Sequence, residues 1–243
     1  MTPERHSRTE LLIGKSALER LNSTRVAIFG VGGVGSYVLE ALVRAGVGSV
    51  IIFDADTVSE SNINRQLIAD YESVGMKKTL AAEARIRKIS PDCKVESYDV
   101  FVTPEYVESF DFSGVDFIVD AIDTVSAKLA LAVRAEKLGI PMIASMGTGN
   151  KLDPSAFVIT DIYKTSVCPL ARVMRGELRK RGVKSLTVLY SKEEPRKIQL
   201  PIGTAEENHG KHPPASISFV PATAGLLIAA HVTNTIINKR EDA

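Results

Sequence analysis

Two basic and two acidic side chains between residues 54 and 123 have the chemistry needed to bind a nucleoside triphosphate. Arg65 lies inside a polar run, and Lys78 follows 13 residues later. A guanidinium grips phosphate oxygens through paired hydrogen bonds and an ammonium neutralises them as a point charge. Asp54 and Asp123 each follow an apolar run, so that one can accept from ribose hydroxyls and the other can hold Mg²⁺ beside the phosphates. The alternative for both cations is ordinary surface charge.

A glycine-rich segment should bring the phosphates to these side chains. The sequence Gly30-Val-Gly32-Gly33-Val-Gly35 follows an apolar run at 26–29 and opens an amphipathic helical pattern, and Asp54 comes 19 residues after Gly35. This order of strand, turn, helix, strand and acid places an anion on the helix N-terminus. By itself the motif also fits proteins that bind NAD, FAD or S-adenosylmethionine, dehydrogenases included.

Further polar groups surround Arg65. The run 55–75 is longer than most connections in compact domains, and such loops are usually functional. Asn62 and Gln66 within it are candidate nucleotide contacts, and Asp56 is either a second contact or an acid that caps the turn. Asp120 lies three residues before Asp123, nearer the strand interior, and we expect a structural role for it.

The elements that position these groups alternate between short apolar runs and helical patterns. Apolar runs at 26–29, 50–53, 117–121 and 142–145 predict buried parallel strands, with a further strand at 94–98, and helices are expected between them. Residues 5–22 predict one or two short helices. The fold class is therefore α/β: a doubly wound, Rossmann-like, mostly parallel sheet with an N-terminal helical segment and a C-terminal extension.

The length and composition limit the organisation of the chain. Its 243 residues suit a nucleotide-binding part at 1–150 and an extension at 151–243. Two widely spaced cysteines and an N-terminus without an apolar leader favour the cytoplasm. The apolar stretch 219–237 contains proline, histidine and asparagine, so we expect a buried or dimer-facing helix and no stable membrane insertion.

Five ordered motifs make the chain similar to the ThiF/MoeB/E1 superfamily of ATP-dependent adenylating enzymes. They are Gly30-x-Gly-Gly-x-Gly35, Asp54-x-Asp56-x-Val58, Ser61-Asn62-x-x-Arg65-Gln66, Gly75-x-x-Lys78 and Ala121-Ile122-Asp123-Thr124. The resemblance implies binding of Mg²⁺ and ATP and attack of a substrate carboxylate on the α-phosphate, which gives an acyl adenylate and pyrophosphate. It also implies a homodimer in which Arg8 reaches the ATP of the other subunit.

The resemblance also implies roles for individual residues. The nucleotide contacts it implies are Gly30, Gly32, Gly33, Gly35, Asp54, Asp56, Asn62, Arg65, Gln66 and Lys78. The catalytic residues it implies are Arg8, Arg65, Lys78 and Asp123, with Asp123 holding Mg²⁺ through ATP.

Two differences from other members of the superfamily indicate which of its subgroups this chain resembles. Members that activate ubiquitin-like proteins usually carry two CxxC pairs for zinc, whereas this chain has only Cys93 and Cys168, so we expect no zinc. The segment 164–197 is instead basic, with ten Lys and Arg against three Glu in a chain of net charge +1. Such an excess fits contacts to a nucleic-acid backbone, although a solvated helix face has the same composition. The candidate substrate-binding residues are Arg172, Arg175, Arg179, Lys180 and Arg181.

Four further segments are similar to the tRNA threonylcarbamoyladenosine dehydratase group within that superfamily. They are Arg8-Thr-Glu-Leu-Leu-Ile-Gly14, Phe101-Val-Thr-Pro-Glu105, Pro169-Leu-Ala-x-x-Met-Arg-x-Glu-Leu-Arg-Lys180 and Val188-x-Tyr-Ser-Lys-Glu-Glu-Pro195. The resemblance implies that the activated carboxylate belongs to N6-threonylcarbamoyladenosine at position 37 of tRNA, which cyclises after adenylation.

Two other functions stay open on the sequence alone. The chain could adenylate the C-terminus of a carrier protein in sulfur transfer, with Cys168 as acceptor and a cysteine desulfurase or sulfur acceptor as partner. It could also be a nucleotide-binding regulatory module without turnover. Cys168 itself is also compatible with a buried cysteine of no chemical role.

Overall fold

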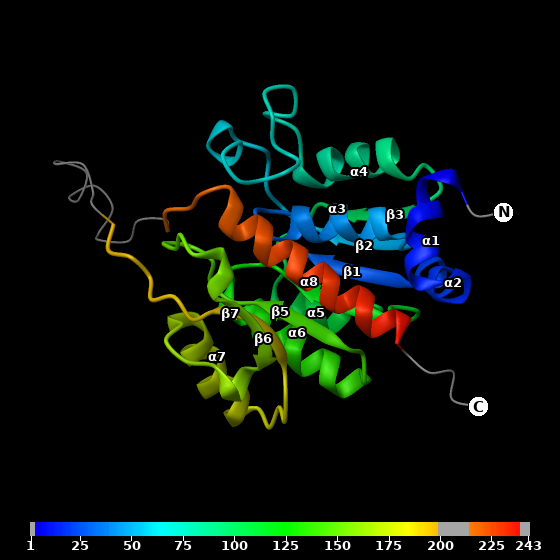
Figure 1. Cartoon of the computed structure of the whole chain (residues 1–243). Coiled ribbons are helices and arrows are strands. Elements are labelled where there is room, and N and C mark those ends of the chain that lie inside the picture. The colour runs from blue at the N-terminus through cyan, green and yellow to red at the C-terminus, as the bar shows by residue number, and fades with distance from the viewer. Residues whose placement is uncertain (1–2, 199–213, 239–243) are drawn as a thin grey trace.

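The computed structural model describes residues 3–198 and 214–238, which form one sheet covered by helices on both faces (Figure 1). The strands are β1 (Arg25–Phe29), β2 (Ser49–Phe53), β3 (Lys94–Tyr98), β4 (Phe117–Asp120), β5 (Met142–Ser145), β6 (Phe157–Asp161) and β7 (Thr187–Ser191). The α-helices are α1 (Ser7–Ile13), α2 (Lys15–Ser23), α3 (Gly35–Ala45), α4 (Lys78–Ile89), α5 (Pro104–Ser109), α6 (Val125–Leu138), α7 (Pro169–Lys180) and α8 (Phe219–Ile237).

The seven strands follow the order β3-β2-β1-β4-β5-β7-β6. All neighbouring pairs are parallel except β6 with β7. The chain leaves β1 toward β2 and later returns to place β4 on the other side of β1. This reversal between β1 and β4 is where doubly wound sheets open a ligand crevice at the carboxyl ends of the strands.

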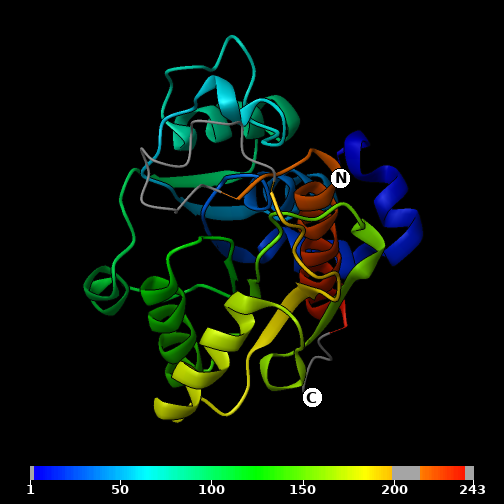
Figure 2. The same cartoon turned by 90° about the vertical axis from the view of Figure 1, so that its left-hand side faces the viewer.

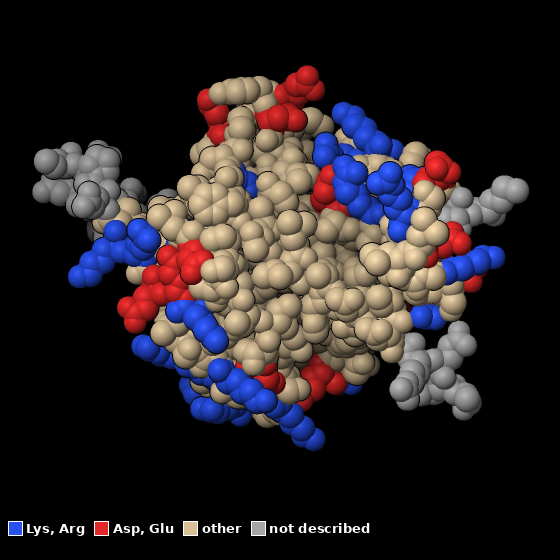
Figure 3. Space-filling model, in the orientation of Figure 1, with Lys and Arg blue, Asp and Glu red and all other residues tan. Residues whose placement is uncertain are grey.

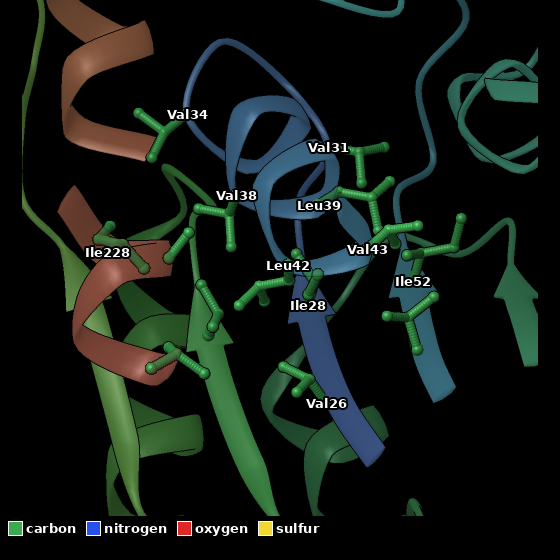
Figure 4. Close-up of a cluster of buried hydrophobic side chains, with 14 of the residues drawn as sticks. Val26, Ile28, Val31, Val34, Val38, Leu39, Leu42, Val43, Ile52 and Ile228 are labelled. Carbon is green, nitrogen blue, oxygen red and sulfur yellow. The ribbon is translucent and has the colours of Figure 1, made fainter. Parts of the chain in front are cut away.

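Strand side chains alternate between two apolar cores. Val26 and Ile28 of β1 face the layer of α3, α4 and α8, whereas Ala27 and Phe29 face α5, α6 and α7. Figure 4 shows the first core, in which side chains of β1 and β2 meet those of α3 and Ile228 of α8. In the second core the rings of Phe29 and Phe53 stack with centroids 4.2 Å apart. Two fully buried faces explain why these strands are apolar along their whole length.

Helix α8 packs unusually close to α3. A Cβ on Gly225 would lie 2.5 Å from the Val34 carbonyl oxygen and 2.7 Å from the Cβ of Tyr37, so only glycine permits this approach. Within the residues that the structure describes, α8 is also the one helix long and apolar enough to cross a membrane by length and composition. Eight of its residues are buried in the protein, which agrees better with a core helix.

The predicted fold class is confirmed. The strands predicted at 26–29, 50–53, 94–98, 117–121 and 142–145 correspond to β1, β2, β3, β4 and β5, and the helices expected between them are α3, α4, α5 and α6. Strands β6 and β7 come from the 151–243 part of the chain and extend the sheet begun by the first 150 residues. The sequence also predicts a long loop at 191–216, part of which lies outside the described residues.

Candidate nucleotide-binding site

A cavity of about 350 Å³ opens at the carboxyl ends of β1, β2 and β4. Figure 2 views the molecule from the side on which α8 begins, which is also the side of this cavity. The cavity is lined mainly by the glycine turn at 30–34, the β2–α4 connection, the loop after β3 and the β4–α6 loop, and Thr148, Ser216 and Pro221 complete its wall. Nine of the ten predicted nucleotide contacts line it, together with Asp123; the tenth, Gly35, starts the adjoining helix.

The glycine turn has no room for side chains at two positions. Gly30 has φ of +87°, and a Cβ there would lie 2.9 Å from the Ala121 carbonyl oxygen. A Cβ on Gly35 would lie 1.8 Å from the carbonyl oxygen of Gly30. The turn is therefore tight enough for helix α3 to begin directly at the cavity, with its first backbone N–H groups and positive dipole end toward a bound anion.

Asp54 organises the turn from the end of β2. Its Oδ2 accepts a hydrogen bond of 2.9 Å from the backbone N–H of Val31, and its Oδ1 accepts one of 2.9 Å from Asp56 N–H. The carboxylate is thus held in one orientation at the edge of the cavity. A fixed acceptor at this position is suited to ribose hydroxyls, as the sequence predicts.

The two predicted phosphate-binding cations differ in their surroundings. Lys78 begins α4 and is almost fully buried, and its Nζ lies 2.6 Å from Asp56 Oδ2 and 4.0 Å from Asp54 Oδ1. Arg65 is half-buried, and its Nη1 donates to the Ser61 carbonyl at 2.9 Å. Asp56 therefore neutralises Lys78 when no nucleotide is bound, and phosphates would compete with it for the ammonium.

Asn62 and Gln66 have different partners in the loop. The side-chain oxygen of Asn62 accepts from Ser59 N–H at 3.1 Å and closes a capping box, so Asn62 shapes the loop. Gln66 is buried beside the glycine turn, and its Oε1 has no hydrogen-bond partner among the described residues. An unpaired buried acceptor at a cavity wall is costly unless a ligand donor reaches it.

Asp123 lies exposed just beyond the end of β4 and points its charge into the cavity region. Thr124 Oγ1 is its hydrogen-bond partner, at 3.5 Å, and no described Lys or Arg pairs with it. The cavity lining contains three carboxylates, Asp54, Asp56 and Asp123, against the two cations Arg65 and Lys78. A polyphosphate would therefore need additional positive charge, which fits a divalent cation held by Asp123.

Comparison with known proteins agrees with this geometry. The chain matches the ThiF family over residues 6–243. It belongs to the ThiF family. It is 43% identical to the tRNA threonylcarbamoyladenosine dehydratase of Bacillus subtilis over 242 residues, which cover 97% of this chain and 95% of that one. The similarity between the two chains thus extends well beyond the nucleotide motif.

Two solved structures share the fold over nearly the whole chain. The Escherichia coli tRNA N6-threonylcarbamoyladenosine dehydratase in complex with ATP has a TM-score of 0.86 and 31% identity. The same enzyme in complex with AMP has a TM-score of 0.87 and 32% identity. Each comparison covers 97% of this chain and 95% of the other. The Escherichia coli enzyme, which has this fold, thus binds both ATP and AMP.

Arg8 is not part of the cavity within one chain of this ThiF-family protein. It lies exposed on α1, near the end of the sheet where the strands begin, since α2 leads directly into β1. The cavity is at the opposite end, where the strands finish. Arg8 can therefore act on a nucleotide only if it comes from another copy of the chain.

The five predicted substrate-binding cations lie on or beside α7, away from the cavity. Arg175 donates to the carbonyl and hydroxyl of Thr165, and Lys180 and Arg181 both pair with Glu177. Their two hydrogen bonds lower the pKa of Glu177 to about 2, so its charge persists at any physiological pH. Arg179 lies over the ring of Tyr163, 5.1 Å from its centroid, and Arg172 is exposed.

The sequence did not identify several residues of the cavity wall. Val100, Phe101 and Val102 reach it from the loop after β3, and Phe101 is 65% exposed there. Ser216 and Pro221 reach it from the start of α8. The position of an exposed aromatic residue just after a strand was the available signal for Phe101, whereas nothing local marked Ser216 or Pro221.

Proposed function

We propose that this chain is an ATP-dependent tRNA threonylcarbamoyladenosine dehydratase. It would cyclise N6-threonylcarbamoyladenosine at position 37 of tRNA through an acyl adenylate. The observation that carries the proposal is the cavity at the carboxyl ends of β1, β2 and β4, which combines the glycine turn, Lys78, Arg65 and Asp123, a carboxylate with which no described Lys or Arg pairs. The similarity over almost the whole chain to enzymes of this name supports the choice of substrate.

The first step is nucleotidyl transfer. An oxygen of the threonyl carboxylate attacks the α-phosphorus of ATP, the bond to the β-phosphate oxygen breaks, and pyrophosphate leaves. Asp54 would orient the ribose, while Arg65 and Lys78 neutralise phosphate charge as it develops. Asp123 would hold Mg²⁺, which supplies further charge neutralisation when bound. Reactions of this kind depend mainly on positioning and electrostatic stabilisation.

The second step needs no nucleophile from the protein. The urea of the same modified base attacks the activated threonyl carbonyl, a five-membered ring closes, the urea loses a proton and AMP leaves. Water is thereby removed at the expense of ATP. Intramolecular attack has a high effective molarity, so positioning is sufficient. This mechanism requires no cysteine, in agreement with the burial of both Cys93 and Cys168.

Helix α7 supports tRNA as the polymeric part of the substrate. Arg172 and Arg179 are exposed cations on α7, and Lys164 and Lys184 are exposed just outside it. Figure 3 shows Lys and Arg side chains grouped over the lower part of the molecule, around α7 in the view of Figure 1. We propose that these cations contact the tRNA backbone, with residues 1–150 as the adenylation core and 151–243 as the tRNA-binding extension.

A homodimer would complete the nucleotide site. Helix α8 carries no charged residue, and Phe219 and Leu226 on it are 43% and 49% exposed. Leu11 and Leu12 on α1 are 88% and 85% exposed. The surface over α8 in Figure 3 is nearly free of charge and is bordered by charged groups. An apolar surface of this kind is typical of a protein interface.

The geometry of α8 favours an antiparallel arrangement of the two copies. Pro221 near its first turn lines the cavity, and Ile237 at its last turn accepts a hydrogen bond of 2.6 Å from Arg20 of α2. The helix is about 28 Å long for its 19 residues. A two-fold axis that crosses α8 near its middle would bring α1 of one copy, with Arg8, to the cavity of the other.

Two weaker elements complete the proposal. We expect the enzyme to act in the cytoplasm, because its two cysteines are free in the structure. A cysteine desulfurase or sulfur-acceptor partner belongs to the alternative function, adenylation of a carrier-protein C-terminus. That alternative has less support, since Cys168 is only 2% exposed and the whole-chain relatives carry the dehydratase name.

The proposed function is tested with purified protein, ATP, Mg²⁺ and tRNA that contains N6-threonylcarbamoyladenosine. The expected result is stoichiometric release of AMP and pyrophosphate and a modified nucleoside lighter by one water in mass spectrometry. Unmodified tRNA and a carrier protein with a Gly-Gly C-terminus serve as control acceptors. Turnover with the carrier protein but not with the tRNA would overturn the proposal in favour of the alternative.

A further inference from the structure

A buried ion pair lies directly beneath the β4–α6 loop that carries Asp123. Asp120 ends β4 and Lys128 lies on the first turns of α6, and both side chains are completely buried. Lys128 Nζ lies 2.9 Å from Asp120 Oδ2. Neither residue touches the cavity, so neither can contact a nucleotide.

The side chains of Asp120 and Lys128 hydrogen-bond to the backbone N–H and the carbonyl oxygen of Ile122. Ile122 N–H donates to Asp120 Oδ1 at 3.2 Å, and Lys128 Nζ donates to the Ile122 carbonyl oxygen at 3.2 Å. The preceding residue is also fixed, because Ala121 N–H donates to the Phe29 carbonyl at 2.8 Å. The peptide groups on both sides of Ile122 therefore have one orientation, and Asp123 is the next residue along the chain.

The same loop packs against the glycine turn. The closest atoms to a hypothetical Cβ on Gly30 are the Ala121 carbonyl oxygen at 2.9 Å and Ile122 Cγ2 at 3.2 Å. The ion pair thus fixes a segment that touches the turn on one side and carries Asp123 on the other. The relative position of the glycine turn and the Asp123 carboxylate depends on how this segment is held.

Fold stability alone does not require such a pair. Burial raises the pKa of Asp120, and the Lys128 ammonium opposes that rise, which means that desolvation and attraction compete. Replacement of a buried ion pair by apolar side chains of similar volume is often neutral or stabilising, whereas loss of one partner is strongly destabilising. A charged pair at this place therefore calls for a reason other than core packing.

We propose that Lys128, together with Asp120, is a positioning residue that sets the geometry of Asp123 toward a divalent cation on the nucleotide phosphates. The inference rests on the proposed role of Asp123 in holding Mg²⁺. Lys128 acts through the Ile122 peptide and makes no contact with substrate. Outer groups that orient a metal ligand commonly change metal affinity by about 10- to 100-fold when they are removed.

The test uses the double variant Asp120→Val, Lys128→Met, which replaces the pair by apolar side chains of similar total volume. Titration of Mn²⁺ into the protein–ATP complex, followed by electron paramagnetic resonance, measures cation affinity without turnover. We expect affinity to fall about 10-fold, with ATP binding in the absence of cation changed less than about two-fold. The thermal unfolding midpoint should stay near that of the unaltered protein.

Three comparison proteins make the result interpretable. Leu131→Ala opens a cavity on a fully buried position of the same helix, so it should lower the unfolding midpoint and leave cation affinity unchanged. Lys128→Met alone should lower both the unfolding midpoint and the cation affinity. Asp123→Asn measures the loss expected when the cation ligand itself is removed.

The outcomes separate the two proposals. Weakened cation binding in Asp123→Asn but not in the double variant would overturn the role of Lys128 and leave the proposed function intact. Unchanged binding in both variants would overturn the metal role of Asp123 and the positioning role together. Lys128 is supported as a positioning residue if both Asp123→Asn and the double variant bind the cation more weakly while the double variant keeps the unfolding midpoint of the unaltered protein.

Discussion

The cavity and helix α7 both carry predicted functional charges, but their side chains are satisfied in different ways. Among the described residues of the cavity, Asp123 has no cationic partner and Gln66 has an unpaired oxygen, so part of the polar surface is left for a ligand. On α7, Glu177 already pairs with Lys180 and Arg181. The cavity is therefore short of positive charge, whereas α7 partly neutralises its own. A count of charges along the sequence misses this difference.

The largest expected effect concerns the missing positive charge of the cavity. Arg8→Ala should lower the turnover rate by about 10³- to 10⁵-fold, the range measured for arginines supplied by a second subunit or partner. Mixed with Lys78→Ala protein, it should regain about a quarter of the normal activity, because half of the dimers are mixed and each contains one intact site. Steady-state rates of the mixture measure this recovery, and a mixture as inactive as its components contradicts the arrangement in trans.

A somewhat smaller effect is expected from the unpaired carboxylate. Asp123→Asn should lower the turnover rate by about 10²- to 10³-fold, since it removes one preorganised electrostatic contact to the reacting phosphates. The loss should shrink as the Mg²⁺ concentration rises. Asp111→Asn, on an exposed turn distant from the cavity, is the matched control for the same chemical change. Equal rates for the two variants at every Mg²⁺ concentration would refute the metal role.

Glycine substitutions sharpen the contrast between the two regions. Gly30→Ala combines a φ of +87° with a contact of 2.9 Å to a carbonyl oxygen, and it should cost about 2–3 kcal/mol of unfolding free energy. In Gly176→Ala, the new Cβ on α7 would have no described atom within 4 Å outside its chain neighbours and its own helix backbone, and the change should stabilise by up to about 1 kcal/mol. Urea unfolding measures both. A similar change in the two variants would mean that the turn is not as tightly packed as described.

The neutralisation on α7 predicts a gain of affinity. Glu177→Gln releases Lys180 and Arg181 from their ion pairs, and tRNA should bind up to about five-fold more tightly, given the modest strength of exposed pairs. The affinity should also fall more steeply with salt. Glu19→Gln, which breaks a similar pair with Lys15 on α2, is the control. Filter-binding at several salt concentrations measures the tRNA affinity of both variants. If Glu177→Gln leaves the slope of affinity against salt unchanged, tRNA does not contact this end of α7.

The smallest expected effect concerns His6, which lies just before α1, the helix that carries Arg8. Burial, with a smaller contribution from Arg5, lowers the pKa of His6 below its usual 6.5, so the folded protein holds this ring neutral. The unfolded chain then takes up a proton first, and stability is lost as the pH falls from 6.5 through the lowered value. Unfolding free energies at pH 7.5 and 5.5 should differ less in His6→Gln than in the unaltered protein. Equal differences would place the pH dependence elsewhere.

Local spacing determined what could be predicted. The glycine turn and Asp54 belong to one contiguous unit of strand, turn, helix and strand, so their meeting follows from the sequence alone. The pairing of Glu177 with Lys180 and Arg181 has the i, i+3 and i, i+4 spacing of a helix and was equally readable. A net charge summed over 164–197 includes Glu177 but does not say that its partners are Lys180 and Arg181.

Contacts that depend on the order of strands could not be predicted. Phe101 approaches the cavity because β3 lies beside β2, and Pro221 does so because α8 packs on α3. The link from Lys128 to Ile122 likewise requires the start of α6 to fold back under the end of β4. No periodicity within a single element reports such distances.

The close fit of α8 on α3 has a consequence for synthesis of the protein. The wall of the cavity joins the turn at Gly33 to Pro221, whose side chain lies 3.3 Å from a hypothetical Cβ on that glycine. These residues are separated by most of the chain, and such non-local contacts form late. A growing chain on the ribosome can build β1, the turn and α3 early, yet it has no complete nucleotide pocket until α8 has emerged. Nucleotide binding would therefore report that the C-terminal helix has docked.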